Sequence, residues 1–104
     1  MNKHRRLVEA ITELERILGA GFAITNRWEA DLLATGISNS TKPGFVAYIA
    51  LREPDGFDVA IDGPPRSGSE LPYEDHGWFR CANIGEVASI LRNFLAFHLP
   101  ESEL

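Results

Sequence analysis

The sequence has little cysteine, since Cys81 is the single thiol among its 104 residues. One thiol cannot form a disulfide within the chain and cannot by itself supply a thiolate-rich metal site. A catalytic role for Cys81 requires a histidine beside it, but His76 is five residues away, too far along a strand and on the opposite face. We therefore expect Cys81 to be a buried structural thiol.

Long apolar runs are also missing. No stretch approaches the roughly 20 consecutive apolar residues that a membrane-spanning helix requires. The N-terminus begins with basic residues but continues as an amphipathic segment, unlike a secretory signal. Together with the lack of disulfides, this predicts a protein of the reducing cytoplasm that does not bind a membrane.

Motifs for nucleotide and metal binding are absent as well. Residues 19–21, Gly-Ala-Gly, follow an expected helix instead of preceding one, and residues 63–68 have prolines where a phosphate-binding loop needs free N–H groups. The three histidines are His4, His76 and His98, and none has a partner at the four-residue spacing of a zinc-binding helix. We expect no cofactor and no metal.

One cluster of ionisable side chains could perform acid–base chemistry. Glu74, Asp75 and His76 are consecutive, and Tyr73 and Asp62 could join them if all five converged in a pocket. Charges in loops are far more often solvated than catalytic. We therefore expect no catalytic residue and no enzyme activity.

Acidic residues outnumber basic ones by fifteen to ten, which gives a formal charge of −5. Such a surface repels phosphates, so direct binding to nucleic acid is not expected. The acids concentrate between residues 53 and 75, where seven of them accompany one base, Arg66. The seven are Glu53, Asp55, Asp58, Asp62, Glu70, Glu74 and Asp75. This stretch carries about as much negative charge as the whole chain.

Helical spacing of apolar residues marks the first part of the chain. Between residues 3 and 18, leucine and isoleucine recur every three to four positions, and Gly19 or Gly21 can end the helix in a left-handed conformation. Basic side chains in the first turn oppose the helix dipole, so this turn should fray or meet acidic groups.

A second helix is expected near the C-terminus. Asn83 is a good N-cap residue, and Glu86 follows three positions later as in a capping box. Apolar residues then recur inward until the helix stops before Pro100. Residues 100–104 form an acidic tail that we expect to be loosely attached.

The clearest strand signal is a hairpin. Residues 45–52 and 57–62 flank a Pro-Asp-Gly turn at 54–56. Apolar residues at 57, 59 and 61 alternate with Asp58, Ala60 and Asp62. This alternation predicts one face in the core and one acidic face in water.

Residues 22–28 and 77–82 also have strand character, while 38–44 and 63–75 have the composition of loops. Residues 29–35 fit either two short helical turns or a continued strand. With 44% hydrophobic residues the chain can fill one core, so residues 1–104 should form a single domain. The predicted fold class is α+β, an antiparallel sheet of about four strands with the N-terminal and C-terminal helices packed on one face.

The aromatic residues allow two interpretations. In a domain this small, tryptophans normally belong to the core or to the second face of the sheet. If both helices cover one face, the other carries Tyr48, Val46 and either Trp78 or Phe79, beside the acids of the hairpin. Aromatic residues among acids on an open sheet favour a protein-binding surface.

Four segments share a pattern with known proteins: Gly36-Ile37, Thr41-Lys-Pro-Gly-Phe45, Gly77-Trp-Phe-Arg-Cys81 and the closing helix from Ile84 to Leu95. They resemble a family of small bacterial immunity proteins that neutralise polymorphic toxins, and the resemblance covers about residues 30–97. It implies tight inhibition of a toxin without catalysis. The same charge distribution suits an inhibitor of a nucleic-acid enzyme, including an anti-CRISPR protein.

We therefore expect a small acidic inhibitor that presents carboxylates to a protein with a basic surface, such as a nuclease or toxin. The expected interface residues are Tyr48, Asp55, Asp58, Asp62, Glu70, Tyr73, Glu74, Asp75 and Trp78. The alternative is an accessory or regulatory domain that homodimerises through its sheet, its acids serving solubility alone. Monomer and homodimer are both compatible with the sequence.

Overall fold

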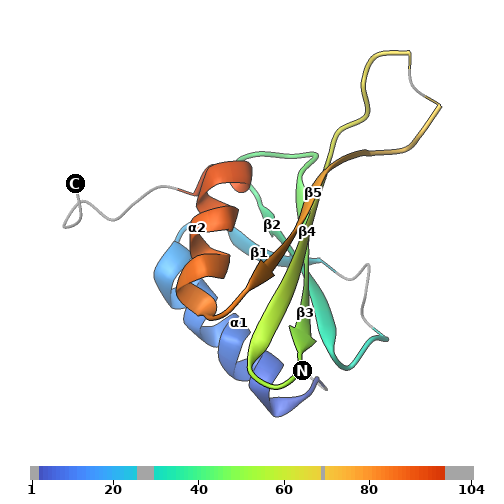
Figure 1. Cartoon of the computed structure of the whole chain (residues 1–104). Coiled ribbons are helices and arrows are strands. Elements are labelled where there is room, and N and C mark those ends of the chain that lie inside the picture. The colour runs from blue at the N-terminus through green and yellow to red at the C-terminus, as the bar shows by residue number, and fades with distance from the viewer. Residues whose placement is uncertain (1–2, 26–29, 69, 98–104) are drawn as a thin grey trace.

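The computed structural model describes residues 3–25, 30–68 and 70–97. Its elements are α1 (Arg5–Leu18), β1 (Phe22–Thr25), β2 (Ala34–Asn39), β3 (Val46–Arg52), β4 (Gly56–Gly63), β5 (Glu74–Cys81) and α2 (Ile84–Leu95). The strands form one antiparallel sheet in the order β1-β2-β3-β4-β5 (Figure 1). The predicted α+β class is confirmed, with five strands where the sequence indicated about four.

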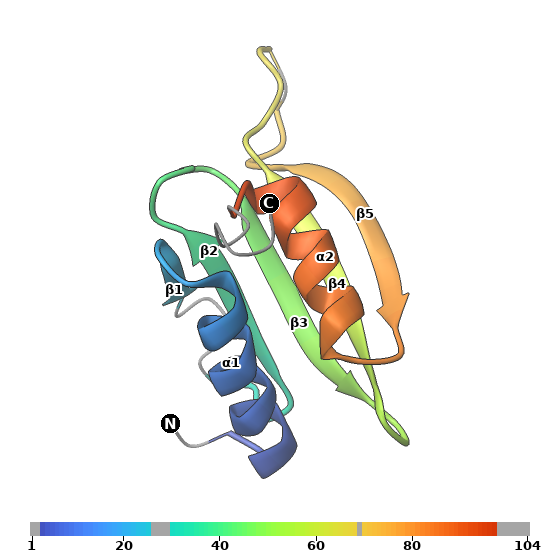
Figure 2. The ribbon, with the colours of Figure 1, turned by 90° about the vertical axis from the view of Figure 1, so that its left-hand side faces the viewer.

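Both helices pack on the same face of the sheet, as predicted. They lie beside one another over that face (Figure 2), α1 against β3 and α2 against β3, β4 and β5. The core fills the space between the layers, and its fully buried side chains include Leu14, Ile37, Ile49, Val59, Leu91 and Leu95. The face turned away from the helices is called the open face below.

The basic first turn of α1 meets acidic groups. Arg5 lies 3.5 Å from Glu9, and Arg6 lies 4.0 Å from Glu53 of the β3–β4 turn. These pairs offset the unfavourable position of the cations at the positive end of the helix dipole. At the other end, Gly19 caps the helix with φ of 70°, a conformation that glycine adopts without strain.

The predicted cap of α2 is confirmed. The Asn83 side-chain oxygen accepts a hydrogen bond from the Glu86 N–H at 3.0 Å, and the Glu86 carboxylate accepts one from the Ala82 N–H at 2.5 Å. The helix ends at Leu95. The acidic tail at 100–104 lies outside the described residues.

The strand that the sequence did not predict as a separate element is β2. Its residues 34 and 35 fall in the stretch for which helical turns were one option, and that option is wrong for them. Residues 38 and 39, predicted as loop, also belong to this strand. β2 pairs with β1 on one side and β3 on the other, so tertiary pairing outweighs the weak strand propensity of Gly36. For the strand predicted at 22–28, the structure describes residues 22–25 and residues 26–29 lie outside it.

Polar side chains fasten the β2–β3 connection to the end of α2. Asn39 is 3% exposed, and its side-chain N–H donates to the Leu95 carbonyl at 2.8 Å. Its side-chain oxygen accepts from the Thr41 backbone N–H at 2.9 Å and from the Thr41 hydroxyl at 2.7 Å. Lys42 donates to the Phe94 carbonyl at 3.1 Å. The last turn of α2 is thereby tied to the sheet.

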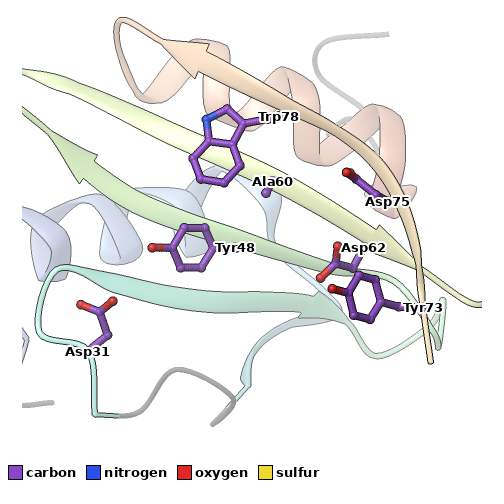
Figure 3. Close-up of a pocket in the computed structure, with 7 residues that line it drawn as sticks. All are labelled: Asp31, Tyr48, Ala60, Asp62, Tyr73, Asp75 and Trp78. Atoms are coloured by element: carbon purple, nitrogen blue, oxygen red, sulfur yellow. The ribbon is translucent and has the colours of Figure 1, made fainter. Parts of the chain in front are cut away.

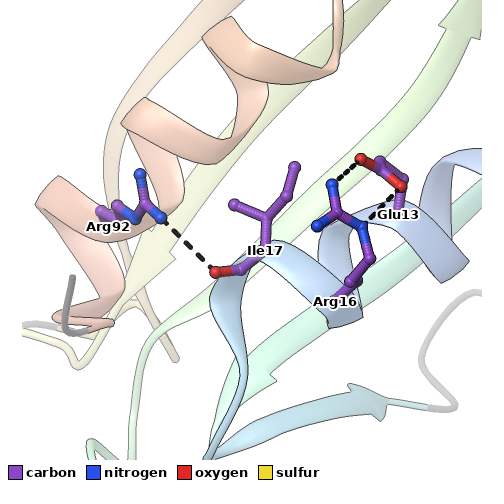
Figure 4. A network of polar contacts seen from close by, with 4 residues as sticks. All are labelled: Glu13, Arg16, Ile17 and Arg92. Atoms are coloured by element: carbon purple, nitrogen blue, oxygen red, sulfur yellow. Dashed lines mark hydrogen bonds and ion pairs between the residues drawn. The ribbon is translucent and has the colours of Figure 1, made fainter. Parts of the chain in front are cut away.

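The two helices are also linked at their C-terminal ends. The guanidinium of Arg92 donates to the backbone carbonyl of Ile17 at 3.4 Å (Figure 4). Nearby on α1, Arg16 forms an ion pair with Glu13. This pair is exposed, so we assign it a small contribution to stability.

The predicted hairpin is confirmed as β3 and β4, and the connection that follows it projects beyond the end of the sheet (Figure 1). The loop is shorter than predicted, because Gly63 completes β4 and β5 begins at Glu74, three residues before the predicted start. Within the described residues, no helix has the length and apolar character needed to cross a bilayer.

Candidate functional site

A cross-strand row of alternating large and small residues runs over the open face. Trp78 of β5 is paired with Ala60 of β4, Ala60 with Tyr48 of β3, and Tyr48 with Gly36 of β2. Residues paired across antiparallel strands project from the same face. Of the pair that the sequence left open, Trp78 faces outward, and Phe79 packs against the core.

The aromatic rings of this row are in contact and accessible. The ring centroids of Tyr48 and Trp78 are 6.1 Å apart with planes inclined by 44°. Trp78 is 61% exposed, which is unusual for the largest apolar side chain. Ala60 lies between them in the cross-strand row and lines the same hollow of the open face.

A pocket of about 540 Å³ opens at this row. It is lined by Asp31, Tyr48, Ala60, Asp62, Tyr73, Asp75 and Trp78, and we call it the aromatic–acid pocket (Figure 3). Its residues come from the loop before β2, from three strands and from the end of the β4–β5 connection. Every ionisable group at its wall is either a carboxylate or a tyrosine hydroxyl.

A β-bulge in β5 places Asp75 in the pocket. The pairing shifts between Ile61 and Asp62, so that Gly77 opposes Ile61, Asp75 opposes Asp62, and His76 is the extra residue. An inserted residue reverses the faces of the side chains that precede it. Asp75 therefore joins Asp62 on the open face.

His76 points to the other side, into the helical layer. Its ring centroid lies 5.5 Å from that of Phe45 and 6.4 Å from that of Phe94 on α2. The expectation that His76 and Cys81 lie on opposite faces is wrong, because the bulge turns His76 to the core side. Glu74, Asp75 and His76 do not converge, since Glu74 binds Arg66 in the loop at 2.6 Å.

The bulge depends on Gly77. Its φ is 130°, a backbone conformation that L side chains rarely adopt, and an added Cβ would lie 3.0 Å from the Phe79 ring. We expect Gly77→Ala to lower the free energy of unfolding by about 1–3 kcal/mol, measured by urea denaturation. A variant as stable as the wild type would contradict this account of the bulge.

The carboxylates act on the tyrosine at the pocket wall. Burial raises the pKa of Tyr48 above its ordinary value, and the negative charges of Asp31 and Asp58 raise it further. The hydroxyl therefore keeps its proton at neutral pH. Burial and the nearby negative charges both disfavour the phenolate form, so they raise the pKa of Tyr48 in the same direction.

Five of the nine predicted interface residues line the pocket: Tyr48, Asp62, Tyr73, Asp75 and Trp78. The other four do not line it. Asp58 is on the open face but lies 3.6 Å from Arg52, and Glu74 is paired with Arg66. Glu70 is exposed in the β4–β5 connection. Asp55 lines a separate hollow beside α1.

The sequence did not indicate Asp31 or Ala60 as site residues. Asp31 precedes β2 in a stretch whose structure was left open, so no register linked it to the hairpin. The alternation placed Ala60 on the solvent-facing side of the hairpin. Its role in the site comes from its small size, because it lies between the Tyr48 ring on β3 and the Trp78 ring on β5. The outward alternation of β4 is the signal that could have selected it.

Cys81 is 1% exposed and belongs to the core, as predicted. Burial raises the pKa of its thiol above the ordinary value, and Glu86 and Asp58 raise it further.

The folded chain holds the Cys81 thiol proton to higher pH than the unfolded chain, so stability decreases as pH rises above about 9. Denaturation at several pH values should show this fall, and Cys81→Ala should reduce it. An equal fall in the variant would contradict the assignment to Cys81.

Among residues 3–25, 30–68 and 70–97, no group of three histidine, cysteine, aspartate or glutamate residues is arranged to hold a metal ion. Comparisons of the chain with protein-family models, with curated proteins and with solved structures find no match. The function is therefore inferred from the chemistry of the site.

Proposed function

We propose that this chain is a small cytoplasmic binding protein that inhibits a macromolecular partner by covering a basic surface of that partner with its open face. It acts as a protein–protein inhibitor without catalysis, in the manner of a toxin immunity protein or an anti-CRISPR protein. The observation that carries this proposal is the gathering of Asp31, Asp62 and Asp75 around the half-buried ring of Tyr48 and the exposed indole of Trp78.

Both components of this surface are suited to a protein partner. Exposed tryptophan and tyrosine bury a large area at low entropic cost and are enriched where interfaces gain most of their binding energy. Carboxylates around them select a partner of opposite charge and speed its association. Tyr48, Asp62, Asp75 and Trp78 lie on paired strands, which hold them in place before binding and lower the cost of ordering them.

Homodimerisation through the open face is the alternative. A two-fold contact through the open face buries the same acidic patch of both copies, so the carboxylates of one copy would be brought near those of the other. Like charges placed together across an interface cost several kcal/mol. The charge of the pocket therefore favours a basic partner over a second copy of this chain.

The test begins with affinity capture from cells of the source organism. Wild-type chain and the Asp62→Asn/Asp75→Asn variant are immobilised in parallel, and proteins retained by the wild type alone are identified and purified. The proposal expects a protein with a basic surface that forms a 1:1 complex and loses its activity when the chain is added in equal amount.

Two outcomes oppose the proposal. A purified complex in which the partner keeps its full activity would refute inhibition. A tight homodimer in sedimentation of the wild-type chain, dissociated by Trp78→Ala, would instead support the self-associating alternative.

A further inference from the structure

The aromatic–acid pocket has a shape and polarity that specify more than a basic partner. Its volume of about 540 Å³ is within the range of pockets that enclose a small ligand or a single side chain. Its floor is the methyl group of Ala60, and its walls include the rings of Tyr48 and Trp78. An aromatic wall this accessible favours a group with a flat or polarisable surface.

The negative charge of the pocket determines that the group it binds is positively charged. Asp31, Asp62 and Asp75 line it, and its other members are uncharged at neutral pH. Figure 3 shows the Tyr48 and Trp78 rings over the middle of the sheet, with Asp62 and Asp75 toward the projecting connection. A cation placed against the indole face would lie within the field of these carboxylates.

Guanidinium fits this combination better than ammonium does. It is planar and weakly hydrated, stacks on aromatic faces, and presents five donors that match carboxylates in pairs. An ammonium group is a compact, strongly hydrated charge and gains less from a flat ring. The exposed Trp78 indole and the neighbouring carboxylates supply both kinds of contact that guanidinium makes.

We infer that the aromatic–acid pocket receives the guanidinium group of an arginine side chain of the partner, stacked on Trp78 and paired with Asp62 and Asp75. This inference rests on the proposed function, because it names the group of the basic partner that the open face recognises. The pocket is an anchor at the centre of a larger protein interface.

The experiment uses Trp78 as its own reporter. The chain has two tryptophans, so Trp28→Phe leaves Trp78 as the single indole. N-acetyl-arginine amide, which imitates an arginine within a protein, is titrated while Trp78 emission is recorded, and N-acetyl-lysine amide is titrated in parallel. We expect saturation by the arginine compound with a dissociation constant on the order of 1 mM, and binding of the lysine compound about tenfold weaker.

Matched variants assign the signal to the pocket. Asp62→Asn/Asp75→Asn should weaken binding of the arginine compound about tenfold or more. Asp55→Asn/Glu70→Gln removes the same number of charges outside the pocket and should leave binding unchanged. No saturable signal, equal binding of the lysine compound, or equal loss in the two variants would each overturn the inference.

Free L-arginine separates a partner's side chain from a soluble metabolite. Its α-ammonium and α-carboxylate together add no net charge to the guanidinium, so it should bind no more tightly than the capped amide, and stronger binding would overturn the assignment to a partner. Failure of the arginine compounds with intact capture of an inhibited partner would refute this inference alone. Saturable arginine binding with no captured partner would refute the proposed function instead.

Discussion

Replacing Asp62 and Asp75 with lysine is expected to weaken binding of the captured partner by about 100-fold or more. The two substitutions place positive charges against the basic surface of the partner, where like charges cost several kcal/mol and each 1.4 kcal/mol is a tenfold loss. Association of the wild type should slow steeply as salt is added, and the variant should lose most of this dependence. Binding kinetics at several salt concentrations provide the measurement.

A matched control separates local charge from total charge. Glu15→Lys/Glu70→Lys changes the net charge by the same amount, from −5 to −1, at exposed positions outside the pocket. We expect its affinity to stay within a few-fold of the wild type.

Because the Asp75 carboxylate also accepts the Gly77 N–H at 2.8 Å, the stability of the lysine variant is measured beside its binding. Asparagine at both positions gives a second variant in which an acceptor remains. Equal losses in the pocket variants and the control would contradict a specific role for the pocket.

Asn39→Asp is expected to lower the free energy of unfolding by about 3–5 kcal/mol, a large fraction of the stability of a small domain. The substitution replaces the N–H that donates to the Leu95 carbonyl with a charged oxygen in a buried place. The new carboxyl group should have a raised pKa in the folded chain. The loss should therefore shrink as pH falls and the group becomes protonated, because a protonated carboxyl can donate to Leu95 again.

Urea denaturation at neutral and acidic pH measures this effect. Asn93→Asp makes the same chemical change on the exposed side of α2 and should cost less than about 1 kcal/mol. A variant at Asn39 as stable as this control at neutral pH would show that the bond between Asn39 and Leu95 contributes little to the fold.

Much of the fold follows from local patterns in the sequence. The helical spacing before Gly19, the Asn83 cap and the alternation from Phe57 to Asp62 predicted two helices, a hairpin and the exposed face of β4. β2 was not predicted because Gly36 and the polar residues of this strand give a weak strand signal. They form a strand here because pairing with β1 and β3 supplies the stability.

The site was predicted less completely than the fold. The prediction grouped acids that are close along the chain. In the folded protein, the register of the strands determines which acids lie close together. Asp55 lies in the turn before β4 and Asp62 near the end of that strand, so the length of β4 separates them, while Asp31 reaches the pocket from a distant loop. Which face Asp75 occupies depends on the bulge before Gly77, and alternation alone would have placed it on the core side.

The central claim is that the open face, and not the helical layer, meets the partner. The most direct test is an NMR titration of the isotopically labelled chain with the captured, purified partner. We expect the largest shift changes at Tyr48, Ala60 and the Trp78 indole, with little change along the exposed sides of α1 and α2. Changes confined to the two helices, with the Trp78 indole signal unmoved, would contradict the claim.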